Sequence, residues 1–280
     1  NFTSATDTYN TAVGYGAGLS VTTGLRNTII GGLAGDALTD ADNNVALGYN
    51  ALGADTLGSA NVAVGQGTLQ AQNFTSATTS YNTAMGHQAG NQVTTGTTNT
   101  LIGGLAGDAI TTASSLVAVG YAALGSNTTG AGNVAVGTNA LLDSTTGGNN
   151  TAVGNNSLSN NITGADNTVM GFEGMKASTT GADNTSVGYQ SLYDNSTGSF
   201  NASFGHRALF NNTTASNNTA VGTSALFANT TGASNIAVGI NALSSNTTAS
   251  NNTAVGAAAL AANTTATGGV GIGYRALNVN

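Results

Sequence analysis

Apolar and polar residues alternate in short runs that return with a 17-residue period along the chain. The phrase NTAVG at 150–154 is representative, and close copies stand at 10–14, 133–137, 218–222 and 252–256. The residue before the closing glycine is always apolar, and the residue two positions earlier is Thr, Val or Ile in most copies. This alternation, bounded by Asn and Gly, predicts one short β-strand in each copy.

The closing glycine of each phrase, called the motif glycine below, gives the period. Consecutive motif glycines keep the 17-residue period, except for one longer step from Gly65 to Gly86. A unit of this length is too short for the common helical repeats, and its content of Gly, Asn and Thr disfavours helices. We therefore expect an all-β fold, a parallel β-solenoid (β-roll) of about 16 coils, each a 17-residue unit. The motif glycines are Gly14, Gly31, Gly48, Gly65, Gly86, Gly103, Gly120, Gly137, Gly154, Gly171, Gly188, Gly205, Gly222, Gly239, Gly256 and Gly273.

The repeat accounts for the whole chain. We expect residues 1–280 to form a single β-solenoid repeat domain, with a four-residue insertion between Gly65 and Gly86. The phrase NFTSAT at 1–6 returns at 73–78, and residues 1–72 are partly duplicated in 73–140. With ~4.8 Å between stacked strands, the coils would make a rod on the order of 75 Å long.

Stacked coils place equivalent side chains above one another, so each position needs a residue that can lie next to a copy of itself without repulsion. Asn stands four residues before the motif glycine in 14 of the 16 units, and stacked amides can donate to and accept from one another. The sequence therefore predicts an Asn ladder. Charged residues make up only 5% of the chain, as expected where like charges would stack and repel. Proline is absent, which suits strands that need every backbone N–H.

Charge and composition exclude several functions. The chain has 11 acidic and 4 basic residues, so it lacks the basic surface that nucleic-acid binding needs. It has no cysteine for disulfides or thiolate metal sites, and no apolar run long enough for membrane insertion. The phrase GGLAGD at 31–36 and 103–108 resembles calcium-binding repeats but is not in tandem, so we expect a glycine-rich corner. No catalytic set, cofactor fingerprint or metal cluster is visible, and we expect no enzyme.

Aromatic side chains follow the motif glycine in eight units. Our first interpretation is corner packing, in which a flat ring shields the bend of the coil. The alternative is a discontinuous strip that contacts surface glycans or a host cell surface. The candidate contact residues are Tyr15, Tyr49, His87, Tyr121, Phe172, Tyr189, His206 and Tyr274.

The phrase Asn-Thr-Thr recurs in the later units and allows two further hypotheses. It contains the N-glycosylation sequon, which makes Asn127, Asn229, Asn246 and Asn263 candidate acceptors. Stacked Thr columns also allow an ice-binding surface, because a regular row of hydroxyls could order water. High β-propensity and ladder hydrogen bonds explain the same Thr content without any ligand.

The run SNNTAVGTSALFANTTGASNIAVGINALSSNTT at 216–248 resembles the head repeats of YadA-like trimeric autotransporter adhesins. It is equally similar to the shafts of bacteriophage tail-fibre proteins, and the likeness covers essentially the whole chain. The resemblance implies left-handed parallel β-rolls that trimerise and attach to a surface. The 17-residue unit is longer than the coil of the adhesin heads.

We therefore expect a non-enzymatic extracellular structural or adhesive fibre segment: a surface adhesin, a tail-fibre shaft or a self-assembling filament subunit. The alternative is an ice-binding β-solenoid that presents Thr ladders. A thin coil with an apolar stripe and uncapped ends should associate with itself, as a homotrimer or as a head-to-tail filament. The chain starts and stops in mid-repeat, so we expect its ends to be met by more chain or by another subunit.

Overall fold

A computed structural model describes residues 7–278, which form strands and turns without a helix. The fold is a parallel β-solenoid of about 16 coils with a 17-residue repeat, which confirms the predicted fold class. Contacts divide the chain into two compact units, Asn1–Thr138 and Asn139–Asn280. Each unit is a solenoid in its own right, and the expectation of a single domain stays a prediction.

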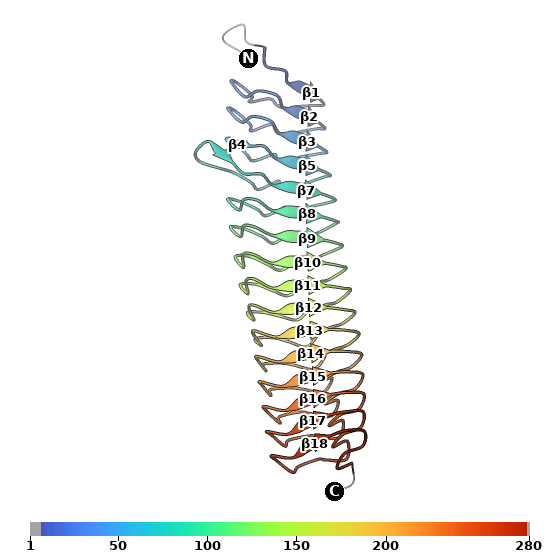
Figure 1. Ribbon diagram of the computed structural model, residues 1–280. Coiled ribbons are helices and arrows are strands. Elements are labelled where there is room, and N and C mark those ends of the chain that lie inside the picture. Colours follow the sequence, from blue (N-terminus) through green and yellow to red (C-terminus); the bar gives the residue numbers. More distant parts are fainter. Residues whose placement is uncertain (1–6, 279–280) are drawn as a thin grey trace. The chain divides into compact units, whose positions relative to one another are not determined.

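The first unit stacks eight three-residue strands in one parallel sheet (Figure 1). These strands are β1 (Thr11–Val13), β2 (Thr28–Ile30), β3 (Val45–Leu47), β5 (Val62–Val64), β7 (Thr83–Met85), β8 (Thr100–Ile102), β9 (Val117–Val119) and β10 (Val134–Val136). A separate parallel pair joins β4 (Gly58–Ser59) to β6 (Thr78–Thr79).

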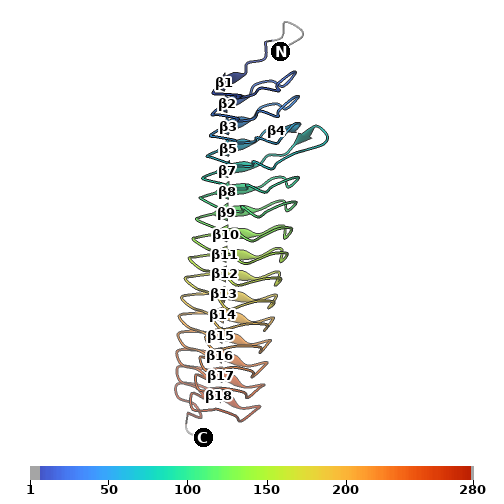
Figure 2. The same cartoon turned by 180° about the vertical axis from the view of Figure 1, so that it is seen from behind.

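The second unit repeats the arrangement with eight strands and no insertion (Figure 2). Each strand pairs with the next in parallel and in the register of the repeat, as in Thr219↔Ile236. The strands are β11 (Thr151–Val153), β12 (Thr168–Met170), β13 (Thr185–Val187), β14 (Ala202–Phe204), β15 (Thr219–Val221), β16 (Ile236–Val238), β17 (Thr253–Val255) and β18 (Val270–Ile272).

The core of a coil is made of small and branched side chains from two segments. The middle residue of the strand and an Ala-Leu pair after it are fully buried, as for Ala220, Ala225 and Leu226. Leu226 adopts a positive φ of 52°, and Leu243 in the next coil does the same at 50°. This unusual conformation for Leu turns the side chain into the coil while the chain bends around it.

The motif glycine ends each strand at a bend that no other residue fits. Gly222 has a φ of +128°, and a Cβ built on it would lie 2.8 Å from the carbonyl carbon and oxygen of Gly239. Successive coils therefore approach backbone to backbone at this column, which explains why the glycine recurs without exception.

The predicted Asn ladder is present. Asn201 donates from its backbone N–H to Oδ1 of Asn184 at 3.0 Å, and its own Oδ1 accepts the N–H of Asn218 at 3.0 Å. Its Nδ2 donates across the coil to the carbonyl of Ala215 at 2.9 Å. Each buried amide thus binds the coils on both sides and closes its own coil.

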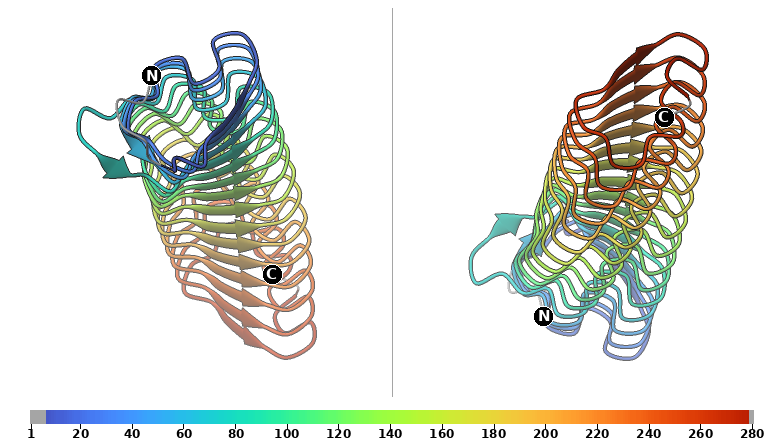
Figure 3. Two further views of the ribbon diagram at one scale, coloured as in Figure 1. Left: turned by 90° about the horizontal axis from the view of Figure 1, so that it is seen from above. Right: turned by 90° about the horizontal axis from the view of Figure 1, so that it is seen from below.

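The four-residue insertion forms a local loop between Asn73 and Thr78. Gln72 still bonds a residue 17 positions earlier, Asp55, whereas Ser80 bonds a residue 21 positions earlier, Ser59. The extra residues lie in the turn before β6, and Figure 3 shows this loop outside the outline of the adjoining coils. The main ladder continues in register from β5 to β7.

Candidate functional site

The chain makes two tight turns after each motif glycine. In the coil of β15 the N–H of Ala225 donates to Gly222 O at 3.3 Å, and the N–H of Asn229 donates to Leu226 O at 3.2 Å. The turn residues Ala225 and Leu226 point inward, because both are fully buried. The first, second, fifth and sixth residues after the motif glycine are therefore the ones on the surface, and we call them the turn face.

The turn face of the second unit carries two ladders of stacked rings. The first ladder stands directly after the motif glycine, where Phe172 stacks on Tyr189 at 5.4 Å and Tyr189 on His206 at 5.2 Å between centroids. The second stands at the fifth position, where Phe210 lies between Tyr193 at 5.1 Å and Phe227 at 5.4 Å. All four pairs are within 15° of parallel, because the stacking of coils imposes the stacking of rings.

A polar ladder lies at the second position, beside both sets of rings. Gln190 Nε2 donates to Glu173 Oε2 at 2.9 Å, and Arg207 Nε donates to Gln190 Oε1 at 3.0 Å. Lys176 Nζ donates to Glu173 Oε1 at 2.7 Å. The bond from Lys176, followed by that from Gln190, holds the pKa of Glu173 below its usual value, and the bond to Glu173 raises the pKa of Lys176.

An open cavity of about 600 Å³ lies where both ring ladders stop. The next residue after His206 in the first ladder is Thr223, and the next after Phe227 in the second is Ser244. These small side chains leave space beside the last rings. The cavity is lined by His206, Arg207, Thr223, Ser224, Phe227, Ala228, Asn241, Ser244 and Ser245.

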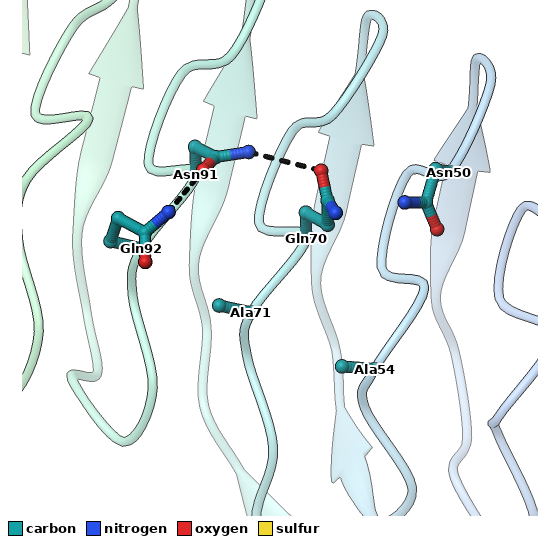
Figure 4. Close-up of a pocket in the computed structure, with 6 residues that line it drawn as sticks. All are labelled: Asn50, Ala54, Gln70, Ala71, Asn91 and Gln92. Atoms are coloured by element: carbon teal, nitrogen blue, oxygen red, sulfur yellow. Dashed lines mark hydrogen bonds between the residues drawn. The ribbon is translucent and has the colours of Figure 1, made fainter.

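The turn face of the first unit holds a cavity of about 410 Å³ at the equivalent columns (Figure 4). Its lining contains amides and no ring: Asn91 Nδ2 donates to Gln70 Oε1 at 3.1 Å, and Gln92 Nε2 donates to Asn91 Oδ1 at 2.6 Å. Both units therefore have a hollow between the second and sixth positions after the motif glycine. The side chains that line this hollow differ between the units. The lining residues are Asn50, Ala54, Gln70, Ala71, Asn91 and Gln92.

All eight candidate contact residues are exposed on the turn face. The structure brings Phe172, Tyr189 and His206 together in the first ladder. In the first unit the aromatic residues alternate with other types, and a Cβ placed on Gly32 would lie 3.5 Å from the ring of Tyr49. That ring covers the glycine corner, as the packing interpretation describes. The remaining candidates in this column are Tyr15, His87, Tyr121 and Tyr274.

The second ring ladder and its arginine were missed at the level of sequence. Tyr193, Phe210 and Phe227 follow one another with the same period as the motif glycine, and this spacing is the signal that would have found them. Arg207 lies between the ladders, with Cζ 5.1 Å from the centroid of Phe210.

The four sequon asparagines lie inside the coil. They form a second column of amides, in which Nδ2 of Asn229 donates to Asn212 Oδ1 and to Gly232 O, both at 2.9 Å. A glycan on Nδ2 would remove such bonds and has no space in the interior. In the folded coil these amides are not accessible as glycan acceptors. The residues are Asn127, Asn229, Asn246 and Asn263, each 3% exposed or less.

The Thr pairs of the same segment divide into two columns. In the pairs before 264–265, the first Thr is half-buried and bonded to the next coil, as where Thr230 Oγ1 donates to Thr247 O at 3.0 Å. The second Thr is exposed, as for Thr231 and Thr248. One regular row of free-standing Thr side chains therefore faces outward in this unit.

A buried carboxyl stands beside the insertion of the first unit. Asp55 is fully buried, and its oxygens accept from Gln72 Nε2 at 2.6 Å and Gly58 N at 3.1 Å. Burial raises the pKa of Asp55, and these hydrogen bonds offset part of that effect. The same column holds Asn, Ser, Gln or an apolar residue in the other described coils, so Asp55 is its one charged member there.

No family model, curated protein or solved structure matches this chain. The described residues include no helix of the length and apolarity that crossing a bilayer requires. Within 7–278 no three His, Asp or Glu side chains gather in a way suited to a metal ion. The turn face of the second unit combines stacked aromatic rings, an arginine and a cavity, and it is the candidate functional site.

Proposed function

We propose that this chain is a segment of a non-enzymatic extracellular fibre that adheres to surfaces and assembles with copies of itself. The observation that carries the proposal is the strand face of each unit, which consists of the first and third residues of every main strand. All of these residues are Thr or apolar, and none is charged. A continuous uncharged surface that contains exposed apolar side chains is typical of a protein interaction site.

Exposure along this face supports self-association. In the second unit Met170, Phe204 and Val221 are 47%, 40% and 37% exposed. A second copy with the same coil spacing would place its own apolar column against these residues at every coil. A homotrimer is the assembly that the resemblance to adhesin heads and tail-fibre shafts implies, and a head-to-tail filament is the other arrangement that heterologous contacts allow.

The repeat itself favours a structural role over catalysis. Each coil contacts only its neighbours, so coils can be gained in blocks without disturbing local packing, as the partial duplication of 1–72 illustrates. Tolerance of length suits a spacer or an adhesive shaft. Rings on the turn face supply contact surface for glycans or a host cell.

Light scattering on the 280-residue chain tests the proposal, and electron microscopy shows the form of the assembly. We expect a discrete trimer or filaments, together with binding of the chain to cells or glycan-coated beads and no hydrolysis of the glycan. A stable monomer that binds no surface would contradict the proposal, and so would catalytic turnover of a glycan.

The exposed Thr row makes ice binding a second candidate function. The row includes Thr180, Thr197, Thr214, Thr231 and Thr248 in consecutive coils of the second unit. Measurement of thermal hysteresis separates the two functions. Hysteresis that disappears when Thr214 and Thr231 are replaced by Lys would favour ice binding over the adhesive fibre.

A further inference from the structure

We propose that the cavity at the end of the two ring ladders binds an acidic saccharide, a pyranose ring that carries a carboxylate, as uronic and sialic acids do. This inference rests on the proposed adhesive function and adds to it a site and a class of ligand. The site lies wholly within the second unit, on its turn face.

The ladders supply two ring faces at the edge of the cavity. Phe227 stacks on Phe210 on one side, at an interplanar angle of 15°, and Ser244 follows it in the column. His206 stacks on Tyr189 in the same way and is followed by Thr223. Each ladder thus ends in a ring that no further ring covers. The apolar C–H face of a pyranose has the size and shape to occupy the next place in such a stack.

Arg207 supplies the charge between these rings. Its Nε–H donates to Gln190, and the planar fork keeps four Nη–H donors for a ligand. A guanidinium binds a carboxylate through two parallel hydrogen bonds, which fixes the orientation of the ligand as well as its charge.

Within residues 7–278 no carboxylate forms an ion pair with this arginine. Among the described residues the ion pair is that of Lys176 with Glu173, and no Asp or Glu lines the cavity. The cavity therefore presents positive charge on a chain whose net charge is −7. This charge favours an anionic ring over a neutral one.

Hydroxyl and amide groups complete the lining. Thr223, Ser224, Ser244 and Ser245 each offer a hydroxyl, and Asn241 offers an amide. Both group types donate and accept, which matches the hydroxyls of a sugar. The volume of about 600 Å³ lies within the roughly 300–1,000 Å³ of small-molecule pockets, so it has space for one or two sugar rings.

The cavity of the first unit provides a contrast. It is lined by amides and alanines, without a ring or a cation. The recurring hollow of the turn face is therefore not sufficient for this ligand, and the specificity lies in Arg207, His206 and Phe227.

Calorimetric titration of the full chain with sialyllactose and with trigalacturonic acid tests the inference, with lactose and cellotriose as neutral probes. We expect at least one acidic probe to bind, and the neutral probes to bind at least 10-fold more weakly. The Arg207→Gln variant should weaken acidic binding by roughly 10- to 100-fold, because bonds to charged groups are the stronger ones. Gln already stands in this column at Gln190, so the substitution suits the coil.

Two further variants separate recognition from folding. Phe227→Ser installs the residue that the next coil has at Ser244, and it should weaken the same binding while the far-ultraviolet circular dichroism is unchanged. Arg275→Gln is the matched control, because Arg275 occupies the same column and lies 5.6 Å from the Tyr274 ring, outside the cavity. It should bind the acidic probes as the unaltered chain does.

The outcomes are distinguishable. Binding of trigalacturonic acid alone identifies a uronate ligand, and binding of sialyllactose alone identifies a sialylated one. Equal binding of acidic and neutral sugars, or binding of neither acidic probe, overturns the inference. Undiminished binding by Arg207→Gln overturns it as well. If the chain still assembles and attaches to surfaces in those cases, the adhesive function stands without this site.

Discussion

The backbone N–H and the side-chain Nδ2 of Asn201 both donate to the same oxygen, Oδ1 of Asn184, at 3.0 Å and 3.1 Å. One buried amide oxygen thus receives two bonds from the coil that follows it. The amide oxygen serves as the acceptor for the backbone N–H of the next ladder residue, while the carbonyl of Asn201 accepts the backbone N–H of Thr185 at 2.9 Å.

Replacing Asn201 with Ala should destabilise the second unit by about 2–4 kcal/mol, because the backbone N–H and Nδ2 of Asn218 would lose a buried acceptor, Asn201 Oδ1. The carbonyl of Ala215 would keep only the bond from Asn212 Nδ2. Chemical denaturation measures the change. Asn211→Ala is the control, since Ala177 and Ala228 already stand in its column, and it should change stability by less than about 0.5 kcal/mol. Equal effects of the two variants would mean that the ladder does not stabilise the coil.

The backbone contact at the motif glycines predicts a large effect of one added methyl group. Gly205→Ala would place a Cβ 2.7 Å from the carbonyl of Gly222 at a φ of +140°, and we expect a loss of more than about 3 kcal/mol. Gly268 has a φ of +72° and no atom within 4 Å of an added Cβ, so Gly268→Ala causes backbone strain without a steric clash. We expect this control variant to lose about 1 kcal/mol. Thermal unfolding compares the variants, and a milder effect at Gly205 would show that the coils can separate there.

Asp55 should make the stability of the first unit depend on pH. Burial raises its folded pKa above the usual 3.8, so the folded state holds the proton more tightly. Stability therefore falls as pH rises from 3.8 through the folded pKa, and the penalty is fully present above that value. Asp55→Asn should stabilise the chain at pH 7 and lose this advantage at pH 3.

Denaturation of both proteins at these two pH values measures the difference. Asp166→Asn, at an exposed position, controls for the change in net charge. The same gain from Asp55→Asn at both pH values would contradict a role for the protonation of this carboxyl.

A charge on the strand face should prevent self-association without unfolding the coil. Phe204→Lys places an ammonium in the exposed column between Val187 and Val221, and a facing copy would have to bury it. We expect light scattering to report a monomer for this variant. Thr231→Lys, on a different exposed column, should assemble as the unaltered chain does, and a monomer there too would point to net charge as the cause.

The fold could be predicted because equivalent residues of successive coils stack in columns, and such columns are visible in the sequence as a 17-residue period. The Asn ladder followed from the same reasoning, since Asn is the residue that can bond to itself above and below. The bend at Leu226 could not be predicted in this way, because a positive φ is rare for Leu and only the stacked core accounts for it.

The turn face was predicted in part. The sequence pattern pointed to the residue after the motif glycine but not to the fifth position, with Phe210 and Phe227. The sequon made these asparagines candidate glycan acceptors, yet the segment around Asn229 buries every third residue, a period that is neither that of a strand nor that of a helix. The interior position of such amides becomes visible only when the coil is closed.

The loop before β6 adds residues to one coil without changing how the neighbouring strands β5 and β7 pair. Thr75, Ser76 and Ala77 are exposed, while the ladder on either side keeps its register. A foreign peptide inserted between Ser76 and Ala77 would therefore be displayed at one defined coil of the first unit. The loop thus gives that unit a graft point that lies outside the ladder, whose register from β5 to β7 does not depend on the length of the loop.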